Sequence, residues 1–121
     1  MAIPSGGGTE VLKVVYETYT SGTVSLLTSG ANEIITILSI VFCEIGNADE
    51  ELYLLIDAAR NDVSGTASQD INILFAEPIG AKKTFVWNDK FVFYGGDVLK
   101  FYAGSAGSID ITVSYIVQDW N

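Results

Sequence analysis

The stretch Glu33-Ile-Ile-Thr-Ile-Leu-Ser-Ile-Val-Phe-Cys-Glu44 decides the fold class of this chain. β-Branched and aromatic residues dominate it, and turn-forming residues flank it on both sides, which is typical of a β-strand. Strict alternation gives such a strand two apolar faces. One face carries Ile34, Leu38, Ile40 and Phe42, and the other carries Ile35, Ile37, Val41 and Cys43. We therefore expect both faces of this strand to be buried.

Outward from this stretch, the chain is a series of short β-rich segments separated by turn residues, and helical periodicity is nowhere sustained over three turns. The predicted strands cover residues 11–18, 23–27, 33–44, 51–57, 70–76, 83–87, 90–94, 98–103 and 108–118. Asn88-Asp89 lies between two aromatic runs and predicts a two-residue hairpin turn. Short strands in this number predict an all-β, antiparallel sandwich or barrel.

The last predicted strand shows which of its faces is buried. Apolar residues occupy alternate positions, and mainly polar residues lie between them. The apolar set is Ile109, Ile111, Val113, Tyr115 and Val117, and the polar set is Asp110, Thr112, Ser114 and Gln118. This strand should therefore have one buried side and one side in contact with water.

The length of 121 residues corresponds to one domain. Residues 1–9 contain Pro4 and three consecutive glycines without a periodic apolar pattern, so we expect a flexible N-terminal arm. Residues 10–121 then form a single β-sandwich domain. The apolar run from Ile34 to Cys43 is about half the length that a membrane-spanning segment needs, which favours a core strand.

Composition excludes several classes of function. The chain has no histidine, so imidazole bases and metal ligands, and the hydrolytic triads built on histidine, are excluded. Cys43 is the single cysteine, so no intramolecular disulfide and no cysteine zinc site can form. The net charge of -9 repels nucleic acid and anionic membrane surfaces. We therefore expect no catalysis, no cofactor, no nucleic-acid partner and no membrane partner.

Carboxylates are the remaining side chains that could act as a catalytic acid and base. The local cluster Asp49-Glu50-Glu51 offers an acid and a base for glycoside hydrolysis, although adjacent acids on a turn are more often a solvated loop. A bound calcium ion is an alternative role for acidic residues, because calcium prefers oxygen ligands. Its candidate ligands are Asp49, Glu51, Asp57 and Asp62, whose spacing lacks the EF-hand pattern. We therefore predict no metal site and leave calcium open.

Aromatic residues crowd into residues 85–102 and permit two interpretations. Alternating rings would fill the interior of a sandwich, which we favour, but they could also form a platform that stacks on sugar rings. The candidate stacking residues are Trp87, Phe93, Tyr94 and Trp120.

The two apolar faces of residues 33–44 predict association between copies of the chain. In an isolated sandwich one of these faces would be exposed, and contiguous exposed apolar patches usually mark association surfaces. We expect Ile35, Ile37 and Val41 to meet a neighbouring copy in a homo-oligomer. The alternative is that a loop of the same chain covers them.

Two stretches, Ala2 to Lys13 and Ile34 to Glu44, resemble a set of small virion proteins of tailed bacteriophages. In those proteins a Pro-Ser-Gly-x-Gly-Thr-Glu-Val-Leu-Lys start precedes a β-domain, and Pro4 to Lys13 match that start. The chain differs in one respect: no basic residue precedes Lys13, so the arm has no positively charged side chain for electrostatic docking.

The resemblance implies a capsid decoration (cement) protein, or another small structural subunit of the head or tail, with a jelly-roll-like β-sandwich of about 8–9 strands. It implies a homotrimer whose arm, including Ile3, Pro4 and Ser5, grips the major capsid protein. The protein would reside in the virion after synthesis in the host cytoplasm. The alternative is a carbohydrate-binding or adaptor module of a phage tail or fibre.

Overall fold

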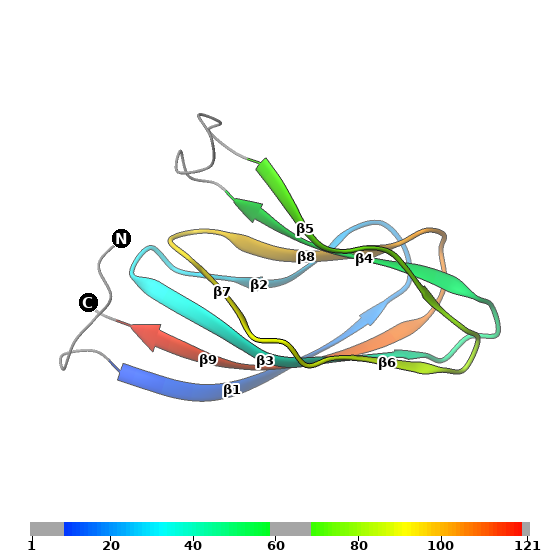
Figure 1. Ribbon diagram of the computed structural model, residues 1–121, viewed down its shortest axis with the longest axis horizontal. Coiled ribbons are helices and arrows are strands. Elements are labelled where there is room, and N and C mark those ends of the chain that lie inside the picture. Colours follow the sequence, from blue (N-terminus) through cyan, green and yellow to red (C-terminus); the bar gives the residue numbers. More distant parts are fainter. Residues whose placement is uncertain (1–8, 59–68, 120–121) are drawn as a thin grey trace.

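The computed structural model describes residues 9–58 and 69–119, which form two packed β-sheets (Figure 1). Within these ranges the chain forms no helix, and hence none that could cross a membrane. The strands are β1 (Thr9–Tyr19), β2 (Val24–Thr28), β3 (Glu33–Glu44), β4 (Glu50–Ala58), β5 (Gln69–Ile79), β6 (Thr84–Trp87), β7 (Phe91–Tyr94), β8 (Val98–Ala103) and β9 (Ile109–Asp119). The bounds predicted for β3 and β8 agree with the structure.

The strand order is that of a jelly roll. One sheet has the order β1-β9-β3-β6, with β7 also paired to β3, and the other has the order β2-β8-β4-β5. Every pairing is antiparallel, and most consecutive strands lie in opposite sheets. This double-sheet arrangement occurs in viral capsid and lectin domains. The predicted antiparallel, jelly-roll-like sandwich is confirmed.

The predicted hairpin at Asn88-Asp89 is wrong. β6 and β7 do not pair with each other: Trp87 lies opposite Ile40 of β3, and Phe91 lies opposite Ile37. The two segments therefore continue one another along the edge of the sheet. Where they are interrupted, the Trp87 indole N–H donates a hydrogen bond to the Asp89 carbonyl oxygen at 2.6 Å. Pairing with β3, which is distant in sequence, overrode the local turn signal.

The core fills the space between the two sheets. Its buried side chains come from eight of the strands and include the apolar face predicted for the last strand, from Ile109 to Tyr115. Phe101 of β8 contacts Tyr19 at 5.2 Å and Phe42 at 5.4 Å between ring centroids, which links the strands of both sheets. Because these rings are large, they dominate the apolar area that folding buries.

A bulge in β3 corrects the expectation about its faces. The pairing with β9 shifts between Ile37 and Ser39, so Leu38 is an extra residue in the strand. Alternation restarts after the bulge, and Ile35 and Ile37 lie on the same core-facing side as Ile40 and Phe42. Ile37 is fully buried within its own chain. The prediction that Ile35 and Ile37 lie on an outer face is therefore wrong.

Candidate functional site

The outward side of the β1-β9-β3 sheet is the most apolar exposed surface of the described residues, and we call it the outer apolar face. The pairing places Leu12 beside Ile116, and Ile116 beside Thr36. Further along the strands, a second row contains Tyr16, Thr112, Val41 and Val86. Between the rows lie Val14, Leu38 and Ser114. The edge segment β7 adds Val92.

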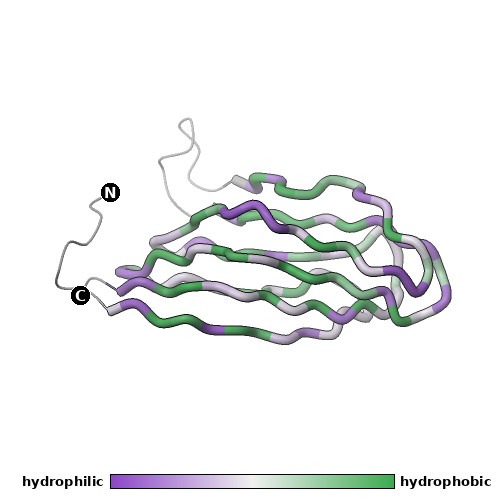
Figure 2. Tube along the Cα trace, turned by 60° about the horizontal axis from the view of Figure 1, so that its bottom comes forward, coloured by the Kyte–Doolittle hydropathy of each residue, from purple (hydrophilic) through white to green (hydrophobic). Residues whose placement is uncertain are grey.

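Several of these side chains are freely accessible to water. Leu12 is 71% exposed, Tyr16 is 73% exposed and Val92 is 52% exposed. Small-ligand pockets usually measure about 300–1,000 Å³. A depression of about 600 Å³ lies on this face beside Leu12, Val14 and Leu38. Figure 2, in which this sheet comes forward, shows hydrophobic residues along its strands. Contiguous exposed apolar patches on proteins are often association surfaces.

Charge on this face lies at its two ends and at Lys13, which helps to line the depression beside Leu12 and Val14. Along β1, β9 and β3, the outward positions between the two rows carry no charged residue. Glu10 lies at one end and accepts a hydrogen bond from Gln118 at 3.3 Å. Asp110 lies at the other end and accepts one from the Thr18 hydroxyl at 2.9 Å. An apolar centre with a polar rim is the usual anatomy of a protein interface.

The structure places one of the three predicted interface residues on this face. Val41 is half-buried and points outward, whereas Ile35 and Ile37 point into the core. Leu12, Val14 and Tyr16 were missed. Alternation in residues 11–17 could have found them, because that segment also has apolar residues on both faces. The arm residues Ile3, Pro4 and Ser5 lie outside the described residues, whereas Thr9 begins β1.

The predicted stacking residues do not form a platform. Phe93 pairs with Ile35, points inward and is only 2% exposed, so its prediction as a stacking surface is wrong. Trp87 packs against the core and contacts Phe91 edge to face at 6.1 Å. Tyr94 is half-buried opposite Ile34. Trp120 lies outside the described residues.

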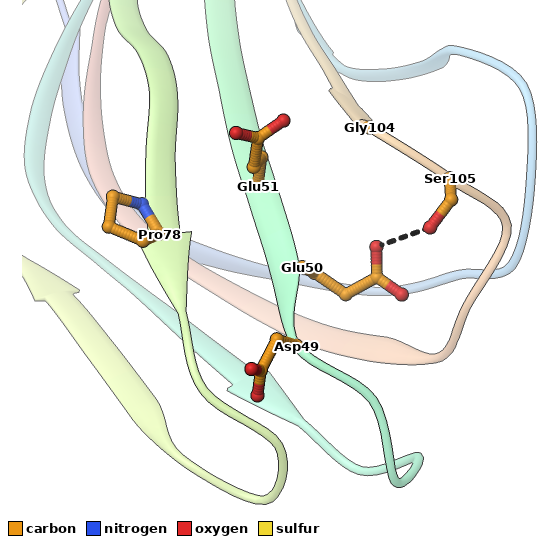
Figure 3. A pocket seen from close by; sticks show the side chains of 6 residues that line it. All are labelled: Asp49, Glu50, Glu51, Pro78, Gly104 and Ser105. Atoms are coloured by element: carbon orange, nitrogen blue, oxygen red, sulfur yellow. Dashed lines mark hydrogen bonds between the residues drawn. The ribbon is translucent and has the colours of Figure 1, made fainter.

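The carboxylates of the Asp49-Glu50-Glu51 cluster line a depression of about 350 Å³, together with Pro78, Gly104 and Ser105 (Figure 3). Asp49 accepts a hydrogen bond from the Ala81 N–H at 2.9 Å, and the buried Glu50 accepts one from the Ser105 hydroxyl at 2.9 Å. Each of these two side chains therefore holds a neighbouring loop in place.

The candidate calcium ligands are not gathered in the described part of the chain. In residues 9–58 and 69–119, no three His, Cys, Asp or Glu side chains come together as metal ligands would. Asp57 pairs with Lys100 at 2.9 Å, and this hydrogen bond and its charge raise the pKa of Lys100. Asp62 lies outside the described residues.

Comparison with known proteins supports the fold class. No protein-family model and no curated protein sequence matches the chain. The core of Drosophila NLP, studied for pentamer formation and histone binding, is 15% identical over 86% of this chain and 97% of that chain, with a TM-score of 0.54. VP2 in the subviral particle of infectious bursal disease virus is 12% identical over 96% of this chain and 34% of that chain, with a TM-score of 0.55.

A third similar structure comes from a bacteriophage. A chain in the acid-stable capsid of Helicobacter pylori bacteriophage KHP30 is 8% identical over 94% of both chains, with a TM-score of 0.50. At these identities the likeness shows the fold alone. The chain is thus a jelly-roll β-sandwich with one strongly apolar outer sheet face.

Proposed function

We propose that this chain is a structural subunit of a bacteriophage virion, specifically a capsid decoration (cement) protein that forms a homotrimer and binds between capsid subunits. The observation that carries the proposal is the outer apolar face, whose outward strand positions between the two rows are uncharged and whose largest side chains are exposed. The occupant of this face is a sister copy of the chain. The protein acts mechanically, without catalysis, because added buried area strengthens a shell against internal pressure.

The fold comparisons support an assembly role. Two of the similar structures belong to viral capsids or subviral particles, and the third is described as forming a pentamer. Jelly rolls suit such assemblies, because their broad sheet faces can pack against neighbouring domains. The resemblance of Pro4 to Lys13 to a phage virion protein start points in the same direction.

Energetics require that assembly buries several apolar side chains of each copy. Burial of one large apolar side chain contributes about 1.5–3 kcal/mol, while association costs ~4–15 kcal/mol. Several side chains per copy must therefore be buried, and Leu12, Tyr16 and Val92 are among those available. In a closed cyclic oligomer, every copy buries its outer apolar face against a neighbour.

The arm supplies the contact with the capsid in this proposal. Ile3, Pro4 and Ser5 dock on the major capsid protein, while the acidic domain stays outside the shell, away from packaged DNA. The protein is made in the host cytoplasm and becomes part of the virion.

Light scattering on the full chain tests the assembly. We expect a mass three times the chain mass of 13.0 kDa, and a single-chain mass for Leu12→Glu, which places a charge on the outer apolar face. Ile45→Glu is the matched control, because Ile45 is also exposed but lies in the turn after β3. A wild-type chain that stays monomeric at micromolar concentration contradicts the trimer.

Quantitative mass spectrometry of purified virions tests the location. A decoration protein should be present in a fixed, high ratio to the major capsid protein, because it occupies a symmetric set of sites. Its absence from virions, or its presence in only a handful of copies, contradicts the decoration role.

The second candidate is a carbohydrate-binding or adaptor module of a phage tail or fibre. A low copy number together with binding to a glycan would favour it. Trp87, Phe93 and Tyr94, the aromatic residues predicted for it, lie in β6 and β7, which belong to the same sheet as the outer apolar face.

A further inference from the structure

Three aromatic rings lie together on the outward side of the β2-β8-β4-β5 sheet. Tyr53 of β4 and Tyr102 of β8 are register partners, and their rings stack with centroids 4.5 Å apart and planes inclined by 4°. Phe75 of β5 meets Tyr53 edge to face, at 5.3 Å and 85°. Phe75 is 70% exposed, which is unusual for a large apolar ring. We call these residues the aromatic trio.

A strained bulge holds Phe75 in this position. Leu52 pairs with Glu77 and Leu54 pairs with Leu74, so both Phe75 and Ala76 stand opposite Tyr53. Ala76 adopts a φ of 57°, a left-handed conformation that costs energy in a residue with a Cβ atom. Bulges that turn a side chain outward are frequent beside binding sites. Here the bulge directs the Phe75 ring into water. Exposure of an apolar ring does not stabilise the fold, so we looked for a binding role for this side chain.

The carboxylate-lined depression adjoins the aromatic trio. Glu51 precedes Tyr53 by two residues on the same side of β4, and its Oε1 accepts a hydrogen bond from the Tyr53 hydroxyl at 3.4 Å. Glu51 is paired with Pro78 across the strands. A Cβ atom at Gly104 would lie 3.1 Å from Glu51 Oε1 and 3.9 Å from Tyr53, so a larger residue here would crowd the Glu51 carboxylate. Figure 3 shows Glu51, Pro78 and Gly104 among the residues that line the depression.

We propose that the aromatic trio and Glu51 form a binding site for a neutral pyranose sugar. A pyranose ring has an apolar C–H face, which stacks on an exposed aromatic ring such as Phe75, and hydroxyl groups at its edge, which donate to a carboxylate such as Glu51. Aromatic walls with a few polar groups are the usual composition of a small-ligand site.

Charge selects against anionic sugars. The chain carries a net charge of -9, and Asp49, Glu50 and Glu51 surround the depression. Lys100, on the same side of the sheet, is already paired with Asp57 at 2.9 Å. Sialylated, sulfated and phosphorylated sugars are therefore repelled. This inference goes beyond the proposed assembly role and uses the opposite sheet.

NMR titration of the full chain with neutral oligosaccharides tests the site. The probes are linear oligosaccharides of glucose, xylose, mannose and galactose, with sialyllactose and a sulfated galactan as anionic controls. We expect amide signals at Tyr53, Phe75 and Tyr102 to shift with a neutral probe and to stay unchanged with the anionic ones. Because the ring supplies the stacking surface, Phe75→Ala should bind about tenfold more weakly.

Further variants separate recognition from folding. Phe75→Trp should restore binding, and Glu51→Gln should weaken it while the melting temperature stays near that of the wild type. Val92→Ala, which removes an exposed apolar side chain from β7 in the opposite sheet, should leave binding unchanged. Leu12→Glu should also leave it unchanged, so that failure of the trimer and failure of the sugar site give different results.

Three outcomes overturn the sugar site. The first is that no neutral probe shifts these signals at millimolar concentration. The second is that Phe75→Ala binds as tightly as the wild type. The third is that tetramethylammonium shifts the trio while sugars do not, since a cation can also bind to aromatic faces beside a carboxylate.

Discussion

Glu44 shows how a single buried acid can organise two loops. Its side chain is 1% exposed, and its two carboxylate oxygens accept hydrogen bonds from the Lys82 N–H at 3.0 Å and the Gly46 N–H at 3.2 Å. These loops follow β3 and precede β6, which are neighbours in the sheet. Because both donors belong to the backbone, the carboxylate replaces contacts that water would otherwise make.

Replacement of Glu44 should therefore cost stability. Glu44→Ala leaves two backbone donors without their partner, and we expect a loss of about 1–3 kcal/mol in the free energy of unfolding, measured by urea titration. Glu44→Gln keeps one acceptor and should lose less. Glu10→Ala, at the exposed end of β1, should change the free energy by less than about 0.5 kcal/mol. Equal losses for Glu44→Ala and Glu10→Ala would refute this role.

Tyr115 makes stability depend on alkaline pH. Burial, and then the nearby charge of Glu33, raise the pKa of Tyr115 above its ordinary value of 10.0. The folded state therefore retains a proton that the unfolded state has lost, so this contribution is full below pH 10 and falls as pH rises through the folded pKa. The pKa values of Tyr53 and Lys100 are raised as well, which acts in the same direction.

We expect the melting temperature of the wild type to fall as the pH rises above about 10. Tyr115→Phe keeps the ring and removes the titrating hydroxyl, so its melting temperature should fall less steeply over the same range. Scanning calorimetry at a series of pH values measures both slopes, and identical slopes would rule out this contribution.

At the scale of the element, the β3 bulge decides which residues face the core. Leu38 and Ser39 together fill the outward position between the inward Ile37 and Ile40. Simple alternation correctly predicts a strand with two apolar faces, but it assigns the wrong residues to each face before the bulge. A bulge depends on the register with β9, and nothing in the local sequence marks it.

Deletions in β3 test this explanation. Removal of Leu38 should leave a regular strand with the same core residues, and the protein should still fold cooperatively. Removal of Val41 should turn Phe42 away from the core and cost about 3–5 kcal/mol, as truncation of a buried Phe does. Circular dichroism during thermal unfolding measures both. Equal tolerance of the two deletions would contradict the bulge.

At the scale of the whole molecule, charge and apolar surface act against each other. Each copy carries a net charge of -9, which opposes assembly, while the outer apolar face favours it. Salt screens the repulsion, because the Debye length falls from about 30 Å at 0.01 M to about 8 Å at 0.15 M.

Self-association should therefore tighten as salt is added. Sedimentation velocity at low and physiological ionic strength should show a larger assembled fraction at the higher salt concentration. Weakening by salt would instead mean that ion pairs hold the copies together, and it would argue against the outer apolar face as the contact.

The sequence by itself determined that the chain is all-β, that it forms an antiparallel sandwich and that the last strand buries its apolar side. These properties are local, because alternation and turn residues act within a few positions of one another. Only the tertiary structure decided that β6 and β7 share one edge of β3, that Ile35 and Ile37 face inward and that Tyr53, Phe75 and Tyr102 meet. Each of these depends on register and bulges between strands that lie far apart in sequence, and pairing partners set that register.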